Sequence, residues 1–464
     1  MDLDKRMPTN SDTLTAVSKA TATSFFANVA TVLGGQAASV AIALLIEICY
    51  ARLAGPGARG QISLCMMTIA FGVLVGGLGA DIPIVIWSAD RQKKASDWLS
   101  AVLLWGAMGT AAAGALWWAV FEKWQLSLLR GVTPSLARVI LLSIPFAILF
   151  SYLTALLTGR ESFRERAGVG LLESAAGLIA FLGLTVLLGR NANAAVWGNL
   201  AGLVVGVAVS ALLLKNVISG SLVAPSATQD VIRGLGVGLR GQIGNVAAFF
   251  NYRLDVFIVN YFLDPTQVGL YAIGVAVSEA LWQIPGAVAV ALFPRTARTI
   301  DEGATNFTCL IMRQVFLVSC ISALGVALVS PWAVPILFGG RFSSSVPVIW
   351  WLLPGAIAIS LAKIAASDLA GRGKTGYSSL FGGIALGVTV ILDLLLIPRM
   401  GIQGAGLASS AAYVVNAALL VTALKFELQV RWRELFVPSR IEFARYKKAW
   451  FSFAVWSGMR SASL

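Results

Sequence analysis

The chain has 464 residues, of which 58% are hydrophobic and only 12% are charged, and its formal net charge is +13. Because a soluble domain carries about 25% charged residues, this composition excludes an ordinary globular protein and indicates an all-α polytopic membrane protein. The sequence contains no histidine, which excludes His-based acid–base catalysis, His metal ligands and a Ser-His-Asp triad.

Apolar runs of about 20 residues, the length that crosses a bilayer, recur about twelve times. The first six are expected at 26–50, 60–86, 98–121, 136–158, 167–189 and 194–215. The second six are expected at 240–262, 268–293, 309–332, 346–368, 377–398 and 404–426. The first 23 residues are polar and contain no apolar run, so we expect no cleaved signal peptide.

The two sets of six segments are related by an offset of 209 residues. Pro56 and Gly60, which follow the first segment, correspond to Pro265 and Gly269. A second block, residues 145–151, is identical at four of its seven positions to the block 209 residues later. A duplicated membrane unit predicts two pseudo-symmetric six-helix lobes around a central cavity, the architecture of alternating-access transport.

The distribution of basic residues predicts the orientation. With both termini in the cytoplasm, 25 of the 35 Lys and Arg lie inside, 8 lie outside, and Arg253 and Lys363 lie within segments. We therefore attribute the positive net charge to the orientation in the membrane and not to a surface that binds nucleic acid. The expected parts are a cytoplasmic N-terminal segment 1–23, an N-lobe 24–216, a cytoplasmic linker 217–239, a C-lobe 240–426 and a cytoplasmic tail 427–464. Because the tail alternates aromatic and basic residues, we interpret it as an interfacial amphipathic helix on anionic lipid.

Several other classes of site are not expected. The four cysteines lack metal-like spacing and are interpreted as packing residues; they are Cys49, Cys65, Cys309 and Cys320. The segment Gly371–Thr375 resembles the end of a phosphate loop, but Asp368 occupies the position where such a loop requires glycine. We therefore expect no catalytic residues, metal site or cofactor, and we do not expect an enzyme.

Polar residues inside the apolar segments are the candidate functional residues, because ionisable groups are costly there. In the seventh segment, Gln242, Asn245, Arg253 and Asn260 fall within an arc of about 80° at helical spacing. This stripe predicts a substrate-binding cavity face, although a structural ion pair between Arg253 and another helix stays open. Asp255 lies about 200° from Arg253, so the two do not share a face.

The first segment carries a similar stripe that includes Gln36, Glu47 and Tyr50. Under the offset of 209 residues Gln36 corresponds to Asn245, so both lobes would turn a polar face toward the same cavity. Glu47 is either an ion-coupling carboxylate or the partner of a cation such as Arg253, and the sequence does not choose between the two.

Three further ionisable residues lie in the second half. Glu279 in the eighth segment has Trp282 beside it and Gln283 one turn later, and Asp393 interrupts the eleventh segment. We take Glu47, Glu279 and Asp393 as the candidates for ion coupling or ion pairing. Lys363 in the tenth segment is a candidate for the cavity, with snorkelling to the membrane surface as the structural alternative.

Five short motifs resemble one transporter family. They are residues 51–60, Arg253-Leu-Asp255, residues 268–271, residues 293–295 and residues 398–405. Over residues 20–426 the chain resembles the polysaccharide transporter (Wzx-type flippase) branch of the multidrug/oligosaccharidyl-lipid/polysaccharide exporter superfamily. The resemblance implies two six-helix lobes around a V-shaped cavity lined with cations, and a flippase of the inner membrane. The implied cargo is an undecaprenyl-pyrophosphate-linked oligosaccharide that is moved to the periplasmic leaflet.

The number of segments narrows the implied cargo. Peptidoglycan-precursor flippases of the superfamily have fourteen helices, so twelve favour a repeat unit of O antigen, exopolysaccharide or capsule. An ion-coupled multidrug or small-molecule antiporter of the same superfamily stays open as the alternative. The expected partners are the lipid-linked oligosaccharide and membrane lipids; a polysaccharide polymerase complex could also bind, and no nucleic acid is expected.

Overall fold

The computed structural model describes residues 10–89, 96–119, 129–215, 227–298 and 302–437, and the regular structure in these ranges is helical throughout. The first half contains α1 (Asn10–Gly76), α2 (Asp81–Ala89), α3 (Ser96–Trp118), α4 (Pro134–Gly159), α5 (Phe163–Leu187) and α6 (Ala192–Leu213). The second half contains α8 (Ala227–Phe262), α9 (Pro265–Leu281), α10 (Gln283–Arg298), α11 (Glu302–Phe338), η3 (Gly340–Phe342), α12 (Ser345–Gly371), α13 (Gly376–Met400), α14 (Ile402–Leu428) and α15 (Trp432–Phe436).

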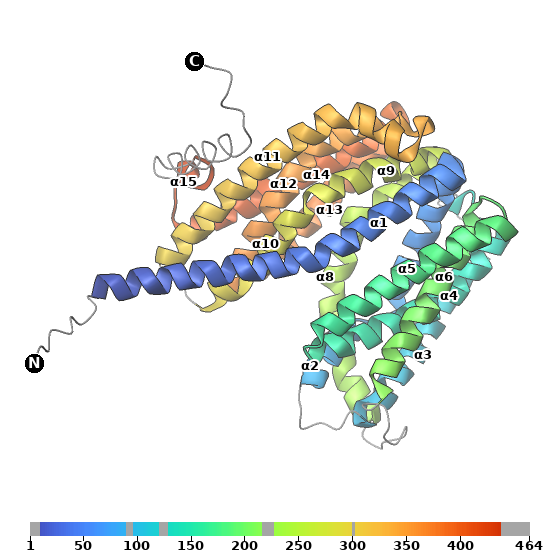
Figure 1. Ribbon diagram of the computed structural model, residues 1–464, viewed down its shortest axis with the longest axis horizontal. Coiled ribbons are helices and arrows are strands. Elements are labelled where there is room, and N and C mark those ends of the chain that lie inside the picture. The colour runs from blue at the N-terminus through green and yellow to red at the C-terminus, as the bar shows by residue number, and fades with distance from the viewer. Residues whose placement is uncertain (1–9, 90–95, 120–128, 216–226, 299–301, 438–464) are drawn as a thin grey trace, which may run out of the picture.

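Figure 1 shows the helices in two groups that converge at one end and diverge toward the other. The N-lobe consists of the second half of α1 with α2–α6, and the C-lobe consists of the second half of α8 with α9–α14. Each lobe has its own apolar core, which includes Trp105 and Phe181 in the N-lobe and Tyr271 and Ile349 in the C-lobe. The predicted two-lobe, all-α architecture is therefore confirmed.

A bend at Gly55 joins two of the expected segments into one long helix. Gly55 adopts φ 75° and ψ 175°, a conformation that is open only to glycine, and Pro56 follows it where no helical N–H is needed. The expected segments 26–50 and 60–86 consequently form α1 up to Gly76. The second of them then breaks near Gly79, where φ is again positive, and α2 follows.

At the converging end of the lobes, side chains bond to backbone carbonyl oxygens, both within the N-lobe and between the two halves. The Gln61 amide donates to the Gly131 carbonyl oxygen at 2.9 Å, within the N-lobe side of this end. The Asn260 amide of α8 donates to the Arg130 carbonyl oxygen at 3.1 Å. The Arg52 guanidinium donates to the carbonyl oxygens of Ile336 and Leu337 at the end of α11. These bonds close the apex of the V.

Helix α8 crosses from one lobe to the other. In its first half the Gln242 amide donates to the Leu74 carbonyl oxygen of α1, and Phe250 lies with its ring centre 5.6 Å from that of Phe71. In its second half Val259 is fully buried in the C-lobe core. The helix begins at Ala227, so residues 227–239 of the expected linker are its first turns, and the boundaries between the expected parts stay predictions.

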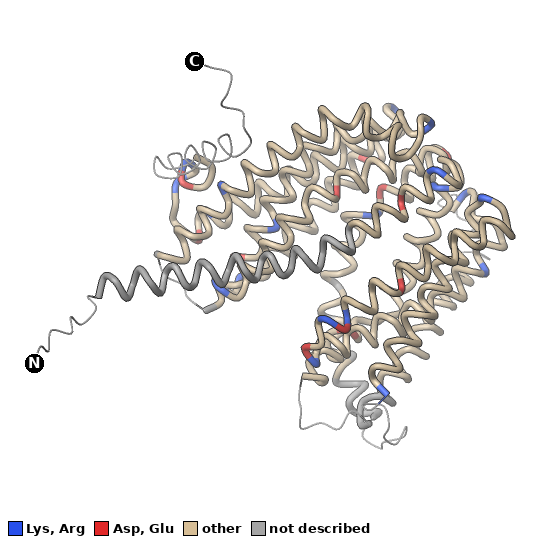
Figure 2. Tube along the Cα trace, viewed as in Figure 1, with Lys and Arg blue, Asp and Glu red and all other residues tan. Residues whose placement is uncertain are grey.

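Eight helices in the described residues are long and apolar enough to cross a membrane, or nine if the bent pair α9 and α10 is one span. The eighth expected segment is in fact broken at Trp282, where the two helices meet at 42°. Figure 2 shows Lys and Arg gathered mainly near the ends of the helices, which leaves a largely uncharged middle. The protein is thus a multi-pass membrane protein, whereas the count of twelve spans is not confirmed.

Candidate functional site

The candidate site is centred on an ion pair inside the C-lobe. Arg253 of α8 contacts Glu279 of α9 through both guanidinium nitrogens, with Nη1–Oε1 at 3.0 Å and Nη2–Oε2 at 3.2 Å. The side chains keep 30% and 21% of their exposure, so the pair is accessible to water. Arg253 thus has an ion-pair partner on another helix, and in this structure that partner is Glu279 and not Glu47.

Lys363 of α12 adds a second cation beside this pair. Its ammonium lies 5.6 Å from the ring centre of Trp282, a cation–π arrangement. It is also close enough to the Glu279 carboxylate to interact with it electrostatically. One carboxylate thus lies near two cations, and the group carries a net positive charge.

Three aromatic rings form a wall next to the cations. The ring centres of Tyr252, Trp282 and Tyr413 lie 5.8–5.9 Å apart in all three pairs. These residues come from α8, from the break after α9 and from α14, so the wall joins three elements of the C-lobe. Aromatic faces of this kind can stack against the apolar faces of sugar rings as well as against each other.

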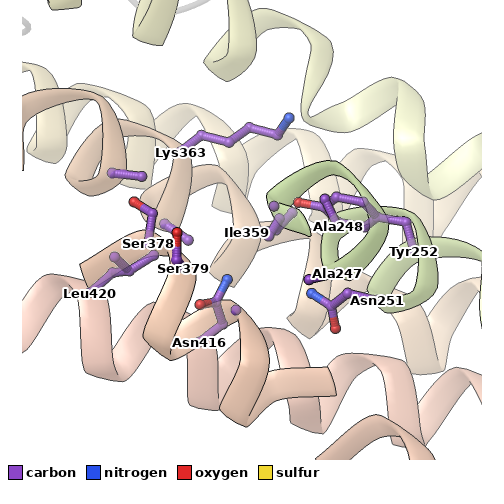
Figure 3. A pocket seen from close by; sticks show the side chains of 14 residues that line it. Ala247, Ala248, Asn251, Tyr252, Ile359, Lys363, Ser378, Ser379, Asn416 and Leu420 are labelled. Atoms are coloured by element: carbon purple, nitrogen blue, oxygen red, sulfur yellow. The ribbon is translucent and has the colours of Figure 1, made fainter. Parts of the chain in front are cut away.

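A cavity of about 490 Å³ lies between α8, α12, α13 and α14 (Figure 3). Its wall includes Lys363 and the aromatic Tyr252, together with Asn251, Asn416 and the hydroxyls of Ser378 and Ser379. In Figure 3 the Lys363 side chain extends along the upper side of this space, away from Asn416. The volume and the mixed polar lining are those of a small-molecule site.

Two buried carboxylates lie deeper in the C-lobe. Asp255 accepts hydrogen bonds from the Tyr271 hydroxyl and, at 3.2 Å, from the Ser409 hydroxyl. Asp393 of α13 is fully buried, and neither of its carboxylate oxygens has a hydrogen-bond partner within the described residues. The two acids are close enough to interact electrostatically. The sequence indicated Asp393 but gave Asp255 no role.

Glu47 belongs to a separate ion pair in the N-lobe. Its Oε2 accepts from Nη2 of Arg59 at 2.6 Å and from Nε at 2.9 Å, across the bend at Gly55. The Arg59 side chain is only 7% exposed and also donates to the Ser63 hydroxyl. Arg59 had not been singled out in the sequence, because it lies in the turn between two expected segments. The pair holds the two arms of α1 at a fixed angle.

The other predicted cavity residues whose side chains are described do not line the cavity of the C-lobe. Tyr50 is 8% exposed and packs edge-on against Phe181 in the N-lobe core, so the structure does not place it in a cavity. Asn260 is fully buried at the apex, and Gln242 bonds to α1. Asn245 is exposed and donates to Gln242 at 3.1 Å. Gln36 lies in the part of α1 whose side chains are outside the described residues.

The family can now be identified. The family model described as "Polysaccharide biosynthesis protein" matches residues 49–347, which contain the bend of α1, the Arg253–Glu279 pair and most of both lobes. The chain belongs to this family. Residues 49–347 also include both copies of the Pro-Gly motif on which the internal repeat was predicted.

Two relatives of this chain are named as a glycan flippase and an O-antigen transporter. A Haloferax volcanii protein named as the low-salt glycan biosynthesis flippase Agl15 is 26% identical over 51% of this chain and 50% of its own length. A Shigella flexneri protein named as an O-antigen transporter is 25% identical over 61% of this chain and 68% of its own length. The alignment with the Haloferax protein therefore spans half of that relative.

Solved structures of membrane transporters share the fold of this chain. The lipid II flippase MurJ in an inward closed conformation superposes with a TM-score of 0.71 over 87% of this chain and 89% of its own, at 13% identity. An inward-facing multidrug resistance MATE family transporter gives 0.65 over 84% and 94%, at 15% identity. At these identities the likeness establishes the transporter fold and does not identify a cargo.

Proposed function

We propose that this protein is a flippase that moves a polyprenyl-pyrophosphate-linked oligosaccharide repeat unit across the inner membrane by alternating access. The product would supply a surface polysaccharide such as O antigen, exopolysaccharide or capsule. The observation that carries the proposal is the group of Arg253 and Lys363 beside three aromatic rings in a water-accessible part of the C-lobe. The names of the Haloferax and Shigella relatives support the same class of cargo.

The cations suit the pyrophosphate. The headgroup is anionic and strongly hydrated, so it crosses the bilayer only where fixed positive charges replace its water. Arg binds two phosphate oxygens through its planar fork, as Arg253 now binds both oxygens of Glu279. Glu279 therefore acts as a stand-in that neutralises Arg253 when no cargo is present, and the pyrophosphate would displace it. Lys363 is close enough to stabilise the released carboxylate.

The aromatic wall and the C-lobe cavity suit the sugars. Tyr252 and Trp282 are partly exposed and offer ring faces, and the buried Tyr413 packs behind them. The cavity next to Tyr252 carries hydroxyl and amide groups on Ser378, Ser379 and Asn416. The lipid tail can remain in the bilayer between the diverging lobes. No covalent bond changes in this process, so the protein would act as a transporter and not as an enzyme.

We also propose that Asp393 is the carboxylate that couples transport to an ion gradient. A buried carboxylate anion without a partner is costly, so Asp393 needs a proton or a bound cation, whereas Arg59 already neutralises Glu47. Asp255 lies beside it with two hydroxyl donors. In this proposal both termini lie in the cytoplasm, because that orientation puts most Lys and Arg residues on the cytoplasmic side. A polysaccharide polymerase complex would be the downstream partner.

Deletion of the gene in its host tests the function. The proposal expects loss of one surface polysaccharide and accumulation of its lipid-linked repeat unit in the cytoplasmic leaflet. The second candidate, a multidrug antiporter, has the shared fold of MATE transporters and the aromatic wall in its favour. Unchanged surface polysaccharide together with increased drug sensitivity would favour that candidate.

A further inference from the structure

The chain reverses direction at the end of α14. Gln429 adopts φ 55°, its N–H donates to the Phe426 carbonyl oxygen, and the Val430 N–H donates to the Lys425 carbonyl oxygen, both at 3.3 Å. This pattern of bonds ends a helix and turns the chain back across its own terminus. Helix α15 follows at once, and so lies beside the end of a membrane-crossing helix and does not extend from it.

One side of α15 is fixed to the C-lobe. Leu435 is fully buried, and the Phe436 ring packs edge-on against Phe316 of α11 with 5.4 Å between ring centres. The Arg313 guanidinium of α11 donates to the Glu434 carbonyl oxygen. These contacts set the orientation of α15, so the residues on its other side are held outward.

The outward side combines exposed aromatic rings with cations. Phe426 is 68% exposed and Trp432 is 46% exposed, although both are large apolar side chains. The Lys425 ammonium lies 4.7 Å from the Phe426 ring centre and 5.5 Å from that of Trp432. Arg431 and Arg433 are exposed on either side of Trp432. We refer to these five residues as the α14–α15 platform.

The platform has an excess of positive charge. Glu427 is already neutralised by Lys374, with 3.3 Å between Nζ and Oε1. Within the described residues 425–437, this leaves the exposed Glu434 as the remaining acid against Lys425, Arg431 and Arg433. Rings exposed at the end of a bilayer-crossing helix, with cations around them, are typical of side chains that sit among lipid headgroups.

We propose that the α14–α15 platform is a binding site for the phosphate headgroup of an anionic phospholipid. Arg431, Arg433 and Lys425 bind the phosphate, and Trp432 and Phe426 enter the boundary between headgroups and acyl chains. Because α15 is fixed to α11, a bound lipid holds that end of the C-lobe at the membrane surface. This site is separate from the Arg253 group and does not depend on which cargo the protein carries.

Native mass spectrometry of the full-length protein tests the site, with phosphatidylglycerol and phosphatidylcholine offered together. Each Lys or Arg at an anionic surface strengthens binding about fivefold, so Arg431→Gln/Arg433→Gln should reduce the preference for phosphatidylglycerol on the order of 25-fold at low salt. Adding Lys425→Gln should remove most of the remaining preference. Salt should weaken the preference in the wild-type protein far more than in these variants.

The matched control is Arg190→Gln/Arg399→Gln, which removes two exposed cations at the membrane face predicted to be opposite. This variant should keep the wild-type lipid preference. The proposal is overturned if the platform variant keeps its preference, or if both variants lose it equally, because net charge alone would then explain the binding. All substituted Arg side chains are exposed, and melting temperatures of both variants should match the wild type.

Discussion

Gly60 of α1 and Gly269 of α9, which are 209 residues apart, pack against each other's helices in a reciprocal manner. A Cβ at Gly60 would overlap the Pro265 carbonyl oxygen, and a Cβ at Gly269 would overlap the Pro56 carbonyl oxygen. Each glycine thus meets the proline of the other copy of the motif. The contact has the pseudo-two-fold symmetry that a duplicated unit predicts, and it brings the lobes together at the apex.

Gly269→Ala should therefore damage the fold. The overlap is with backbone on both helices, which cannot rotate away, so we expect a loss of about 3 kcal/mol or more in stability. The measurement is the melting temperature of the purified protein in detergent. The matched control is Gly325→Ala in α11, where a Cβ would meet nothing within 4 Å. A Gly269→Ala protein as stable as this control would contradict the close crossing.

Glu47→Gln should also destabilise the protein. It leaves the Arg59 guanidinium, only 7% exposed, without its anion, at a cost of about 3 kcal/mol. Glu434→Gln, at an exposed position, should leave the melting temperature unchanged. If Glu47→Gln instead keeps full stability and alters only the ion dependence of transport, Glu47 is the coupling carboxylate.

Asp393→Asn should keep the fold and lose coupling. Neither carboxylate oxygen has a partner within the described residues, so a neutral amide of similar size costs little stability. Gradient-driven transport should lose its dependence on the imposed ion gradient. Asp368→Asn is the control, because Asp368 accepts from Thr308 and Arg372, and this variant should be less stable. Unchanged gradient dependence in Asp393→Asn would remove this residue from coupling.

Glu279→Gln should strengthen binding of the cargo. If the carboxylate competes with pyrophosphate for Arg253, its neutralisation removes the competitor, and we expect an increase of about tenfold in affinity, equivalent to about 1.4 kcal/mol. Binding of a fluorescent lipid-linked oligosaccharide to purified protein measures this. Weaker binding in Glu279→Gln would show that the carboxylate helps to hold the cargo.

The sequence predicted the features that depend on composition and period. It predicted two helical lobes in a membrane from the apolar runs, the 209-residue repeat and the distribution of basic residues. The expected breaks were less accurate, because local backbone conformation decides them. Gly55 joins two segments in one bent helix, and Trp282 lies at a break inside a run that reads as a single apolar segment.

The candidate site was predicted only in part, because helical spacing identifies a face but not what covers it. Arg253, Lys363 and Glu279 do come together, since each carries a charge inside an apolar segment. Tyr50 and Asn260 lie in polar stripes of the sequence, yet Phe181 packs against Tyr50 and Asn260 bonds to the backbone at Arg130. Tyr413 was not anticipated, because an aromatic residue in an apolar helix gives no signal of its own.

Leaflet exchange in proteoliposomes tests the central claim most directly. A fluorescent polyprenyl-pyrophosphate oligosaccharide in the inner leaflet should become accessible to an external quencher in the presence of the wild-type protein. Arg253→Ala should abolish this exchange, and Arg253→Lys should recover only part of it, because the planar fork is lost. Lys374→Ala, which removes an exposed cation paired with Glu427, should exchange normally. Exchange by Arg253→Ala at the wild-type rate, or no exchange by the wild-type protein, would contradict the account.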